Sequence, residues 1–399
     1  MFFKSRYSCF LLFLFILVSC GEHESLLPVV LIDVENKVDV KEIHSFSGGV
    51  SFKPQGNFVS YPIGNDNIIV PSENSVISVN LSKGVTNWVV DLKEEYIKHL
   101  SLTDSSVDTA GFTGSSVVHN GVIYLFSEFG YVFAVDVNKG KVLKVSKGFQ
   151  KEFSSNALIY NNNLYIQASD NSLVCIGIND LKQKWIYQRQ SSLLSIRGSS
   201  TPILVRNKIV FGSSDGLIVF LDPKSGALIK SFQISYSGGF DIISNISDID
   251  SNIVYDKYFH LLSFNSGFFA FDERKSAVSW SLPDIKGSKN YILHNDIFYI
   301  SDRDDIVYAV DRKGSVKWSN SLFARRSLSS FVVIGNILVF GDYEGFLHFL
   351  DIKDGDYIGR HNVSSEGLFG LKVIGANKLF VNSYMGDSYL FSINYKQKK

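Results

Sequence analysis

GYVFAVDVNKGKVLK, residues 130–144, contains the pattern from which the architecture of the chain follows. An apolar strand ends in an acid, a short turn with glycine comes next, and another strand begins at once. The pattern returns in GLIVFLDPKSGALIK (216–230), GFFAFDERKSAVSW (267–280), DIVYAVDRKGSVKW (305–318) and GFLHFLDIKDGDYIG (345–359). Weaker copies are NSVISVNLSKGVTNW (74–88), NSLVCIGINDLKQKW (171–185) and GDSYLFSIN (386–394). The chain therefore consists of eight similar units.

Each unit has one residue that closes the strand before the glycine turn. These residues are Asn80, Asp136, Gly177, Asp222, Asp272, Asp311, Asp351 and Ser392, at spacings of 39 to 56 residues. A period near 40 that is built from short strands is typical of a β-propeller with four strands in each blade. We predict an all-β, eight-bladed β-propeller. Tryptophans recur at a fixed place in four units, and we expect them to pack between neighbouring blades: Trp88, Trp185, Trp280 and Trp318.

The eighth unit lacks one strand, because the sequence ends soon after its third strand. An open sheet edge invites aggregation, so a ring needs its last blade completed. The segment EIHSFSGGV, residues 42–50, precedes the first unit and can supply a strand. We therefore expect the N-terminal strand to close the last blade and the propeller to span residues 43–396.

The first 20 residues have the composition of a secretion signal. Two basic residues precede ten apolar ones, CFLLFLFILV at 9–18, which is about half the length that a membrane span needs. The following L-V-S-C-G resembles a bacterial lipobox, which implies that Cys20 is acylated, although an ordinary secretory peptide is the alternative. We predict a lipoprotein signal peptide over 1–19 and a lipidated tether over 20–42. Gly21, in place of an aspartate, favours the outer membrane.

Composition argues against several classes of function. The 39 basic residues match the 39 acidic ones, so the chain has no positive excess for a phosphate backbone and we expect no nucleic-acid partner. Cys175 is the one cysteine of the predicted propeller, in an apolar run, and we expect it to be buried. The eight histidines form no metal-binding pair, and no nucleophile elbow or phosphate loop is present. We predict no catalytic residue, no metal and no cofactor.

Two segments interrupt the repeat. SSLLSIRGSSTP, residues 191–202, precedes the fourth unit, and SYSGGFDIISNISDIDSN, residues 235–252, precedes the fifth. Apolar residues beside an arginine, with acids on a neighbouring loop, match the composition of a protein–protein hot spot. Ordinary packing between blades is the alternative interpretation.

These segments, the lipobox and the run GDYEG at 341–345 together resemble the BamB family, the lipoprotein subunit of the outer-membrane β-barrel assembly (BAM) machinery. The resemblance covers essentially the whole chain. It implies that Leu194, Ile196 and Arg197 bind POTRA domains of the barrel subunit BamA. It also implies that Asp248 and Asp250 orient the arginine or meet a partner cation. Ile196 stands where the family usually has leucine, a nearly volume-conserving change.

The resemblance implies a non-enzymatic scaffold, lipid-anchored in the outer membrane and facing the periplasm. It would assist the folding and insertion of outer-membrane proteins by positioning the machinery or by offering strand edges to unfolded clients. The first alternative is a quinoprotein dehydrogenase, since enzymes that bind pyrroloquinoline quinone (PQQ) use the same repeat. A propeller lipoprotein with an unrelated partner is the second. The fold alone does not separate these functions.

Overall fold

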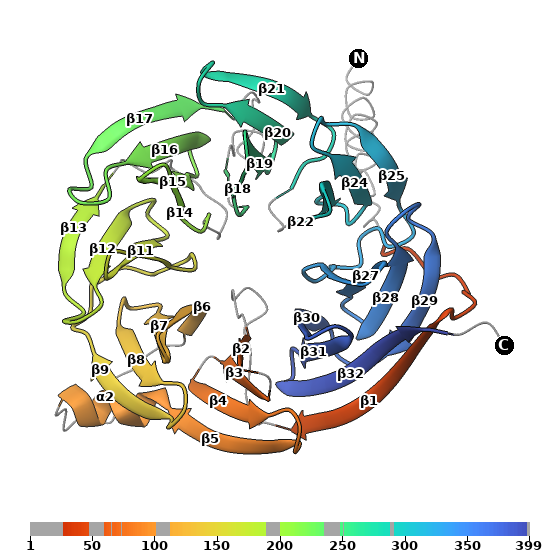
Figure 1. Ribbon diagram of the computed structural model, residues 1–399, viewed down its shortest axis with the longest axis horizontal. Coiled ribbons are helices and arrows are strands. Elements are labelled where there is room, and N and C mark those ends of the chain that lie inside the picture. Colours follow the sequence, from red (N-terminus) through yellow and green to blue (C-terminus); the bar gives the residue numbers. More distant parts are fainter. Residues whose placement is uncertain are drawn as a thin grey trace, which may run out of the picture.

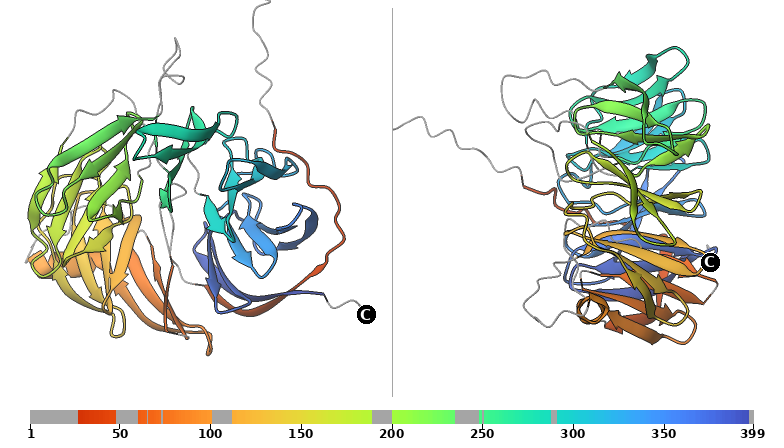
Figure 2. Two further views of the ribbon diagram at one scale, coloured as in Figure 1. Left: turned by 45° about the horizontal axis from the view of Figure 1, so that its top comes forward. Right: turned by 90° about the vertical axis from the view of Figure 1, so that its left-hand side faces the viewer.

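The computed structural model describes residues 27–47, 60–64, 66–72, 74–100, 112–188, 200–234, 248–249, 251–287 and 291–396. They form eight four-stranded antiparallel sheets arranged around a central axis (Figure 1). The edge-on view in Figure 2 shows the sheets side by side in a single layer. The predicted eight-bladed β-propeller is confirmed.

In blades one to seven the strands follow the chain from the axis outward. Blade one has β2 (Tyr61–Ile63), β3 (Asn67–Pro71), β4 (Ser75–Asn80) and β5 (Val85–Asp91), and blade two has β6 (Phe112–His119), β7 (Val122–Ser127), β8 (Val132–Asp136) and β9 (Lys141–Val145). Blade three has β10 (Leu158–Tyr160), β11 (Asn163–Gln167), β12 (Leu173–Gly177) and β13 (Gln183–Tyr187), and blade four has β14 (Ile203–Val205), β15 (Lys208–Gly212), β16 (Leu217–Leu221) and β17 (Leu228–Gln233).

The second half of the ring repeats this order. Blade five has β18 (Val254–Tyr255), β19 (Phe259–Ser263), β20 (Gly267–Asp272) and β21 (Ala277–Leu282), and blade six has β22 (Ile292–His294), β23 (Ile297–Ser301), β24 (Val307–Asp311) and β25 (Val316–Asn320). Blade seven has β26 (Val332–Ile334), β27 (Ile337–Gly341), β28 (Phe346–Asp351) and β29 (Tyr357–Asn362). Blade eight has β30 (Leu368–Ile374), β31 (Lys378–Ser383) and β32 (Asp387–Tyr395), and its outermost strand is β1 (Val38–Ser47).

The pairing of β1 with β32 closes the ring, as predicted. The strand begins at Val38, which pairs with Tyr395, and so it starts within the segment expected to be tether. A register shift between Glu42 and His44 explains why the alternation of apolar residues was not visible in the sequence. The bulge shifts the alternation by one residue, so apolar side chains before and after it fall on different positions of the alternating pattern.

The turn after the third strand explains the repeated acid and glycine. Asp136 closes β8, and its Oδ1 accepts hydrogen bonds from the backbone N of Asn138 at 2.9 Å and of Lys139 at 3.0 Å. Gly140 follows with φ of 63°, a left-handed conformation that glycine adopts without steric cost. The acid caps the turn and the glycine reverses the chain, so the pair recurs in most blades.

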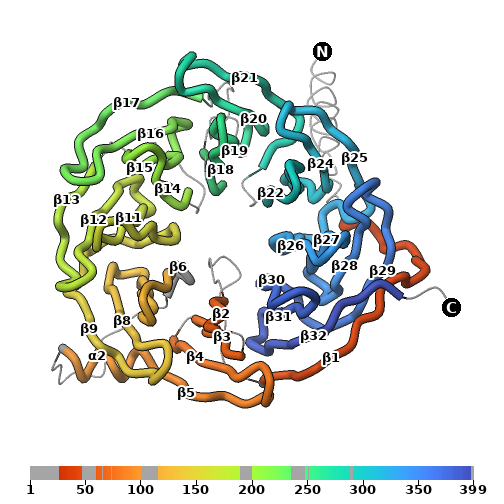
Figure 3. The backbone as a smooth tube through the Cα atoms, viewed as in Figure 1, coloured from red at the N-terminus to blue at the C-terminus, as the bar shows by residue number. Residues whose placement is uncertain are grey.

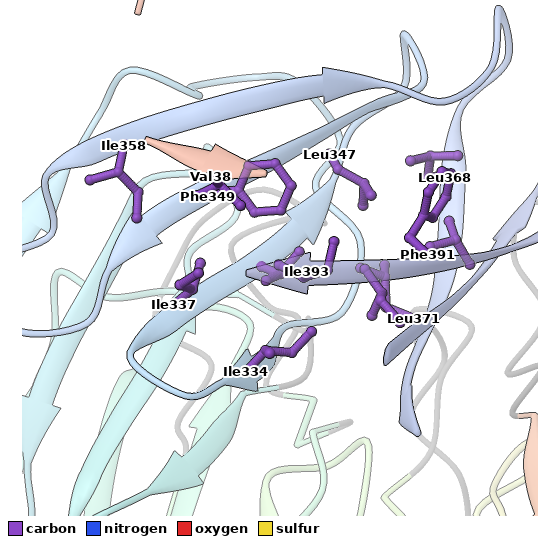
Figure 4. Packing of buried hydrophobic residues seen from close by; sticks show 13 residues of the cluster. Val38, Ile334, Ile337, Leu347, Phe349, Ile358, Leu368, Leu371, Phe391 and Ile393 are labelled. Carbon is purple, nitrogen blue, oxygen red and sulfur yellow. The ribbon is translucent and has the colours of Figure 1, made fainter. Parts of the chain in front are cut away.

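The cores lie between blades. Each of the eight apolar clusters formed by the described residues draws on two neighbouring sheets. Figure 4 shows the cluster between blades seven and eight, where Val38 of the closing strand packs with Phe349, Leu371 and Ile393. The N-terminal strand therefore completes a core as well as a sheet.

The tryptophans pack between blades, as predicted. The ring of Trp318 in blade six lies against Gly355 in the turn of blade seven, and its Nε1 donates to Ile352 O at 3.1 Å. The other three rings meet the equivalent glycines of the next blade: Trp88 with Gly140, Trp185 with Gly226, and Trp280 with Gly314. These contacts set the angle between successive sheets.

A short helix, α2 (Leu92–Leu100), follows blade one and was not predicted. Asp91 caps its N-terminus, since its Oδ1 accepts hydrogen bonds from the backbone N of Lys93 at 2.9 Å and of Glu94 at 3.0 Å. Leu92 and Tyr96 bury their side chains between blades one and two. This insertion contributes to the long spacing of 56 residues between Asn80 and Asp136.

Candidate docking site

Two connections between blades lie next to each other in the ring. Residues 188–202 join β13 to β14, and residues 234–253 join β17 to β18. Because the strands of each blade alternate in direction, every connection from an outermost strand to the next innermost strand leaves on the same face. We call this side of the ring the connection face.

The described ends of the two connections are hydrogen-bonded to each other. The backbone N of Thr201 donates to Oδ1 of Asn252 at 3.4 Å. Ser200, beside it, is fully buried, and its Oγ accepts a hydrogen bond from the backbone N of Gly212 at 3.2 Å. Thr201 is four residues from Arg197, and Asn252 is two residues from Asp250. The two predicted stretches are therefore held together at their bases.

Asp248 and Ile249 lie below the surface, and both are fully buried. The backbone N of Ile249 donates to Ser213 O at 3.3 Å, and its side chain packs against Gly212. The carbonyl of Asp248 accepts a hydrogen bond from Phe264 N at 3.1 Å. The structure therefore places Asp248 in the interior, and its role toward the arginine or a partner cation stays a prediction.

The remaining predicted residues lie outside the described ranges: Cys20, Leu194, Ile196, Arg197 and Asp250. Their roles stay predictions. The anchoring residues Ser200, Thr201 and Asn252 were not predicted. Ser200 and Thr201 belong to the run Ser-Ser-Thr-Pro that carried part of the family resemblance, so the signal was present but had no assigned role.

A buried charge cluster surrounds the turn between β27 and β28, in the run 341–345 that also carried the resemblance. Asp342 accepts a hydrogen bond from Arg326 Nε at 2.8 Å and is hydrogen-bonded to His348 Nε2 at 3.0 Å. Arg326 also contacts Glu344. Burial alone would raise the pKa of Asp342, but the bonds from His348 and Arg326 outweigh it and hold the pKa below its usual range. Sequence patterns did not indicate Arg326, because nothing local links it to Asp342.

Other chemistry has little support in the described part of the chain. There, no group of three or more His, Cys, Asp or Glu side chains is placed to hold a metal ion. Cys175 is buried, as predicted, and burial raises the pKa of its thiol to about 11, so the reactive thiolate is disfavoured. Within the same ranges, no helix has the length and apolar character needed to cross a bilayer.

Comparison with known proteins bears on the whole ring. The family model described as outer membrane protein assembly factor BamB matches residues 72–320. The chain belongs to the BamB family. The BamB protein of Moranella endobia is 28% identical over 378 residues, which cover 92% of this chain and 94% of that relative. The resemblance inferred from the sequence is confirmed.

Solved structures agree on the architecture. The crystal structure of BamB from Moraxella catarrhalis superposes with a TM-score of 0.72 and 23% identity, covering 89% of this chain and 100% of that one. A europium-containing methanol dehydrogenase superposes with a TM-score of 0.68 and 12% identity, covering 88% of this chain and 93% of that one. At such low identities these likenesses establish the fold alone. Membership of the BamB family therefore rests on the sequence match.

Proposed function

We propose that this chain is a non-enzymatic scaffold subunit of the outer-membrane β-barrel assembly machinery. It is anchored through acylated Cys20 to the periplasmic side of the outer membrane. It docks residues 194–197, supported by 248–250, onto POTRA domains of a BamA-like barrel subunit. Family membership supports the assembly role. The residues of the docking patch come from the sequence motifs.

The hydrogen bond between Thr201 and Asn252 carries the proposal. It joins two connections that are 51 residues apart in the sequence, so apolar residues, an arginine and acids can form one patch. The bases of both connections are buried against β15, which gives the patch a rigid support. Asp248, buried beneath the connection face, orients Arg197 by attracting its guanidinium.

Unfolded clients can be recognised at the rim of the ring. Four of the outermost strands pair with one neighbouring strand in their sheets and expose large apolar side chains: Val89 on β5, Leu228 and Ile229 on β17, Val278 on β21, and Val316 on β25. An extended, partly apolar client can pair its backbone with the edge of such a strand and place side chains on these residues. This interaction is secondary to POTRA docking in the proposal.

The alternative function, a quinoprotein dehydrogenase, is supported by the fold that this chain shares with such an enzyme. Such an enzyme needs a metal ion beside its quinone, and in the described part of the chain no group of three or more His, Cys, Asp or Glu side chains is placed to hold one. Addition of quinone and calcium, followed by an assay for dye reduction, tests this directly. Sustained reduction with an alcohol or sugar substrate would contradict the scaffold assignment.

The docking patch is tested by Arg197→Ala in the native cell. We expect the barrel subunit to be lost from co-purification while the melting temperature of the purified propeller is unchanged, because truncating a hot-spot arginine removes binding energy at the interface. Arg303→Ala is the matched control, since Arg303 lies in a turn on the connection face of blade six. Equal recovery of the barrel subunit with both variants would contradict docking at this patch.

A further inference from the structure

The chain before β1 is held against the ring. Residues 27–37, which we call the strap, run back from blade eight past β29 to the connection between blades six and seven (Figure 3, red). At one end Lys37 N donates to Ile358 O at 2.8 Å, and near the other Val29 N donates to Ala324 O at 3.0 Å. Ala324 lies between β25 and β26, so the strap ends on the connection face.

Three arginines of the ring bind the backbone of the strap. Their guanidinium groups donate to carbonyl oxygens: Arg325 to Leu27 at 2.8 Å, Arg326 to Val29 at 3.0 Å, and Arg360 to Ile32 at 3.0 Å. Arg326 is itself fixed by Asp342 in the buried charge cluster. Charge-assisted hydrogen bonds of this kind are among the stronger ones in proteins, so the strap is fixed along its length.

Asn36 fills a gap at the seam of the ring. Blade seven has Gly359 at the position where four other blades have tryptophan, and the side chain of Asn36 lies directly over that glycine. Oδ1 of Asn36 accepts a hydrogen bond from Arg360 N at 2.9 Å, and its Nδ2 donates to Arg360 O at 2.8 Å. A larger side chain at residue 359 would displace the strap, so the missing tryptophan and the docked strap belong together.

The outer side of the strap is apolar. Leu31 packs into the core between blades six and seven, whereas Leu27, Val30 and Ile32 are 73%, 84% and 49% exposed. Large apolar side chains that are held in one place and left exposed mark a surface that another apolar phase covers. Leu27 is seven positions after Cys20, and an extended chain spans at most about 3.5 Å per residue, or about 25 Å in all.

We propose that the strap fixes the orientation of the ring on the membrane, with the edge of the connection face at blades six and seven toward the bilayer and Leu27, Val30 and Ile32 against the lipid surface. This rests on the proposed acylation of Cys20, which brings the strap within reach of the bilayer. A tether that began at β1 would let the ring tumble. The strap moves the attachment point to blades six and seven, so one edge of the connection face is the part of the ring nearest the lipid.

The test uses the mature lipoprotein on vesicles of phosphatidylethanolamine and phosphatidylglycerol that carry a headgroup quencher. A fluorophore is placed on single cysteines at Val30→Cys in the strap, Ser327→Cys on the connection face, and Lys353→Cys in a turn on the opposite face, all exposed. The native Cys175 is buried and does not compete for the label. We expect the label at 30 to lose most of its emission, that at 327 to lose part, and that at 353 to keep nearly all.

Two variants test whether the strap causes the difference in quenching between the labels at 327 and 353. Arg325→Ala combined with Arg360→Ala removes two of the three arginine contacts and leaves the buried Arg326–Asp342 pair in place, so the ring stays folded. We expect quenching at 327 and 353 to become equal. Arg303→Ala, which alters no strap contact, keeps the original difference. Equal quenching of the two labels with the strap intact would overturn the orientation and leave the anchor and the docking patch standing.

The anchor is tested separately. Cys20→Ala should abolish labelling with radioactive palmitate, while hydrogen exchange shows the amides of Val29 and Lys37 still protected, because the ring holds the strap without lipid. Rapid exchange at both amides would overturn the docked strap. Unchanged lipid labelling would remove the anchor, and the orientation with it, without bearing on POTRA docking.

Discussion

Gly355 illustrates how single residues set the spacing of the blades. Its φ is 77°, and a Cβ added there would lie 2.5 Å from Cε3 of Trp318. Gly375 is a matched control, because its φ is 63° and a Cβ there would meet nothing within 4 Å. We expect Gly375→Ala to lower the free energy of unfolding by about 1 kcal/mol, the cost of a left-handed alanine. Gly355→Ala should cost about 3 kcal/mol, since the indole must also move. Urea unfolding followed by fluorescence measures both, and equal losses would contradict the blade contact.

His260 is a second residue with a measurable consequence. It is buried among aromatic rings that include Phe298 and Trp280, and its Nε2 is hydrogen-bonded to Asp256 Oδ1 at 3.2 Å. Burial lowers the pKa of His260 from 6.5 to about 4. The unfolded chain therefore binds more protons between these pH values, so stability falls as the pH falls through this window. The difference corresponds to about 3 kcal/mol at most.

His260→Phe removes this titration and keeps a ring in the site, while Asp256 retains its contact with Arg312. We expect the free energy of unfolding of the variant to decline less between pH 6.5 and pH 4 than that of the native chain. Urea unfolding at several pH values gives the comparison. If the free energies of unfolding of the variant and of the native chain declined in parallel with pH, His260 would have the same pKa in the folded and the unfolded chain.

At the scale of elements, two equivalent turns separate charge from geometry. Asp342 and Asp302 both begin the turn between the second and third strands of their blades. Asp342 is hydrogen-bonded to Arg326 and His348. The carboxylate of Asp302 instead accepts hydrogen bonds from neutral donors: the backbone N of Asp304 and of Ile306 at 2.9 Å and the hydroxyl of Tyr308 at 3.2 Å. The two sites differ mainly in the buried ion pair.

We therefore expect Asp342→Asn to lower the free energy of unfolding by about 3 kcal/mol, because it removes the buried carboxylate that pairs with Arg326 and leaves the more exposed Glu344 as the partner. Asp302→Asn should cost about 1 kcal/mol or less, since the amide oxygen can keep the turn bonds. Chemical denaturation of the two variants under one condition measures the difference. A larger loss at Asp302 would show that turn geometry, not charge pairing, dominates.

The elements also show what the sequence could reveal. The acid and glycine of each turn act within a few residues, so units such as 130–144 were visible as a repeat and predicted the propeller. The strap was not visible, because its partners are distant: Arg325 and Leu27 are 298 residues apart. Helix α2 could not be predicted, because nine residues contain too few turns for a helical pattern of apolar residues to stand out. The docking patch was predicted from family motifs, and of its residues only Asp248 lies within the described ranges.

At the scale of the whole molecule, stability depends on the closure of the ring. β1 pairs with β32 from Val38 to Ser47, and Val38 completes the core between blades seven and eight. Without β1, the edge of β32 would be open and this core would lose one wall. Blade one would also lose a neighbour, because His44 of β1 lies against Gly84 in the turn of the first blade.

Two truncations test this dependence. A chain that begins at residue 27 keeps the strap and β1, and we expect it to be monomeric with the melting temperature of the unlipidated full chain. A chain that begins at residue 48 lacks β1, and we expect a markedly lower melting temperature and association through the exposed edge of β32. Light scattering after gel filtration and thermal unfolding followed by circular dichroism measure both properties. If the shorter chain were a monomer of undiminished stability, the remaining blades would be self-sufficient, and the N-terminal strand would cover the ring without closing it.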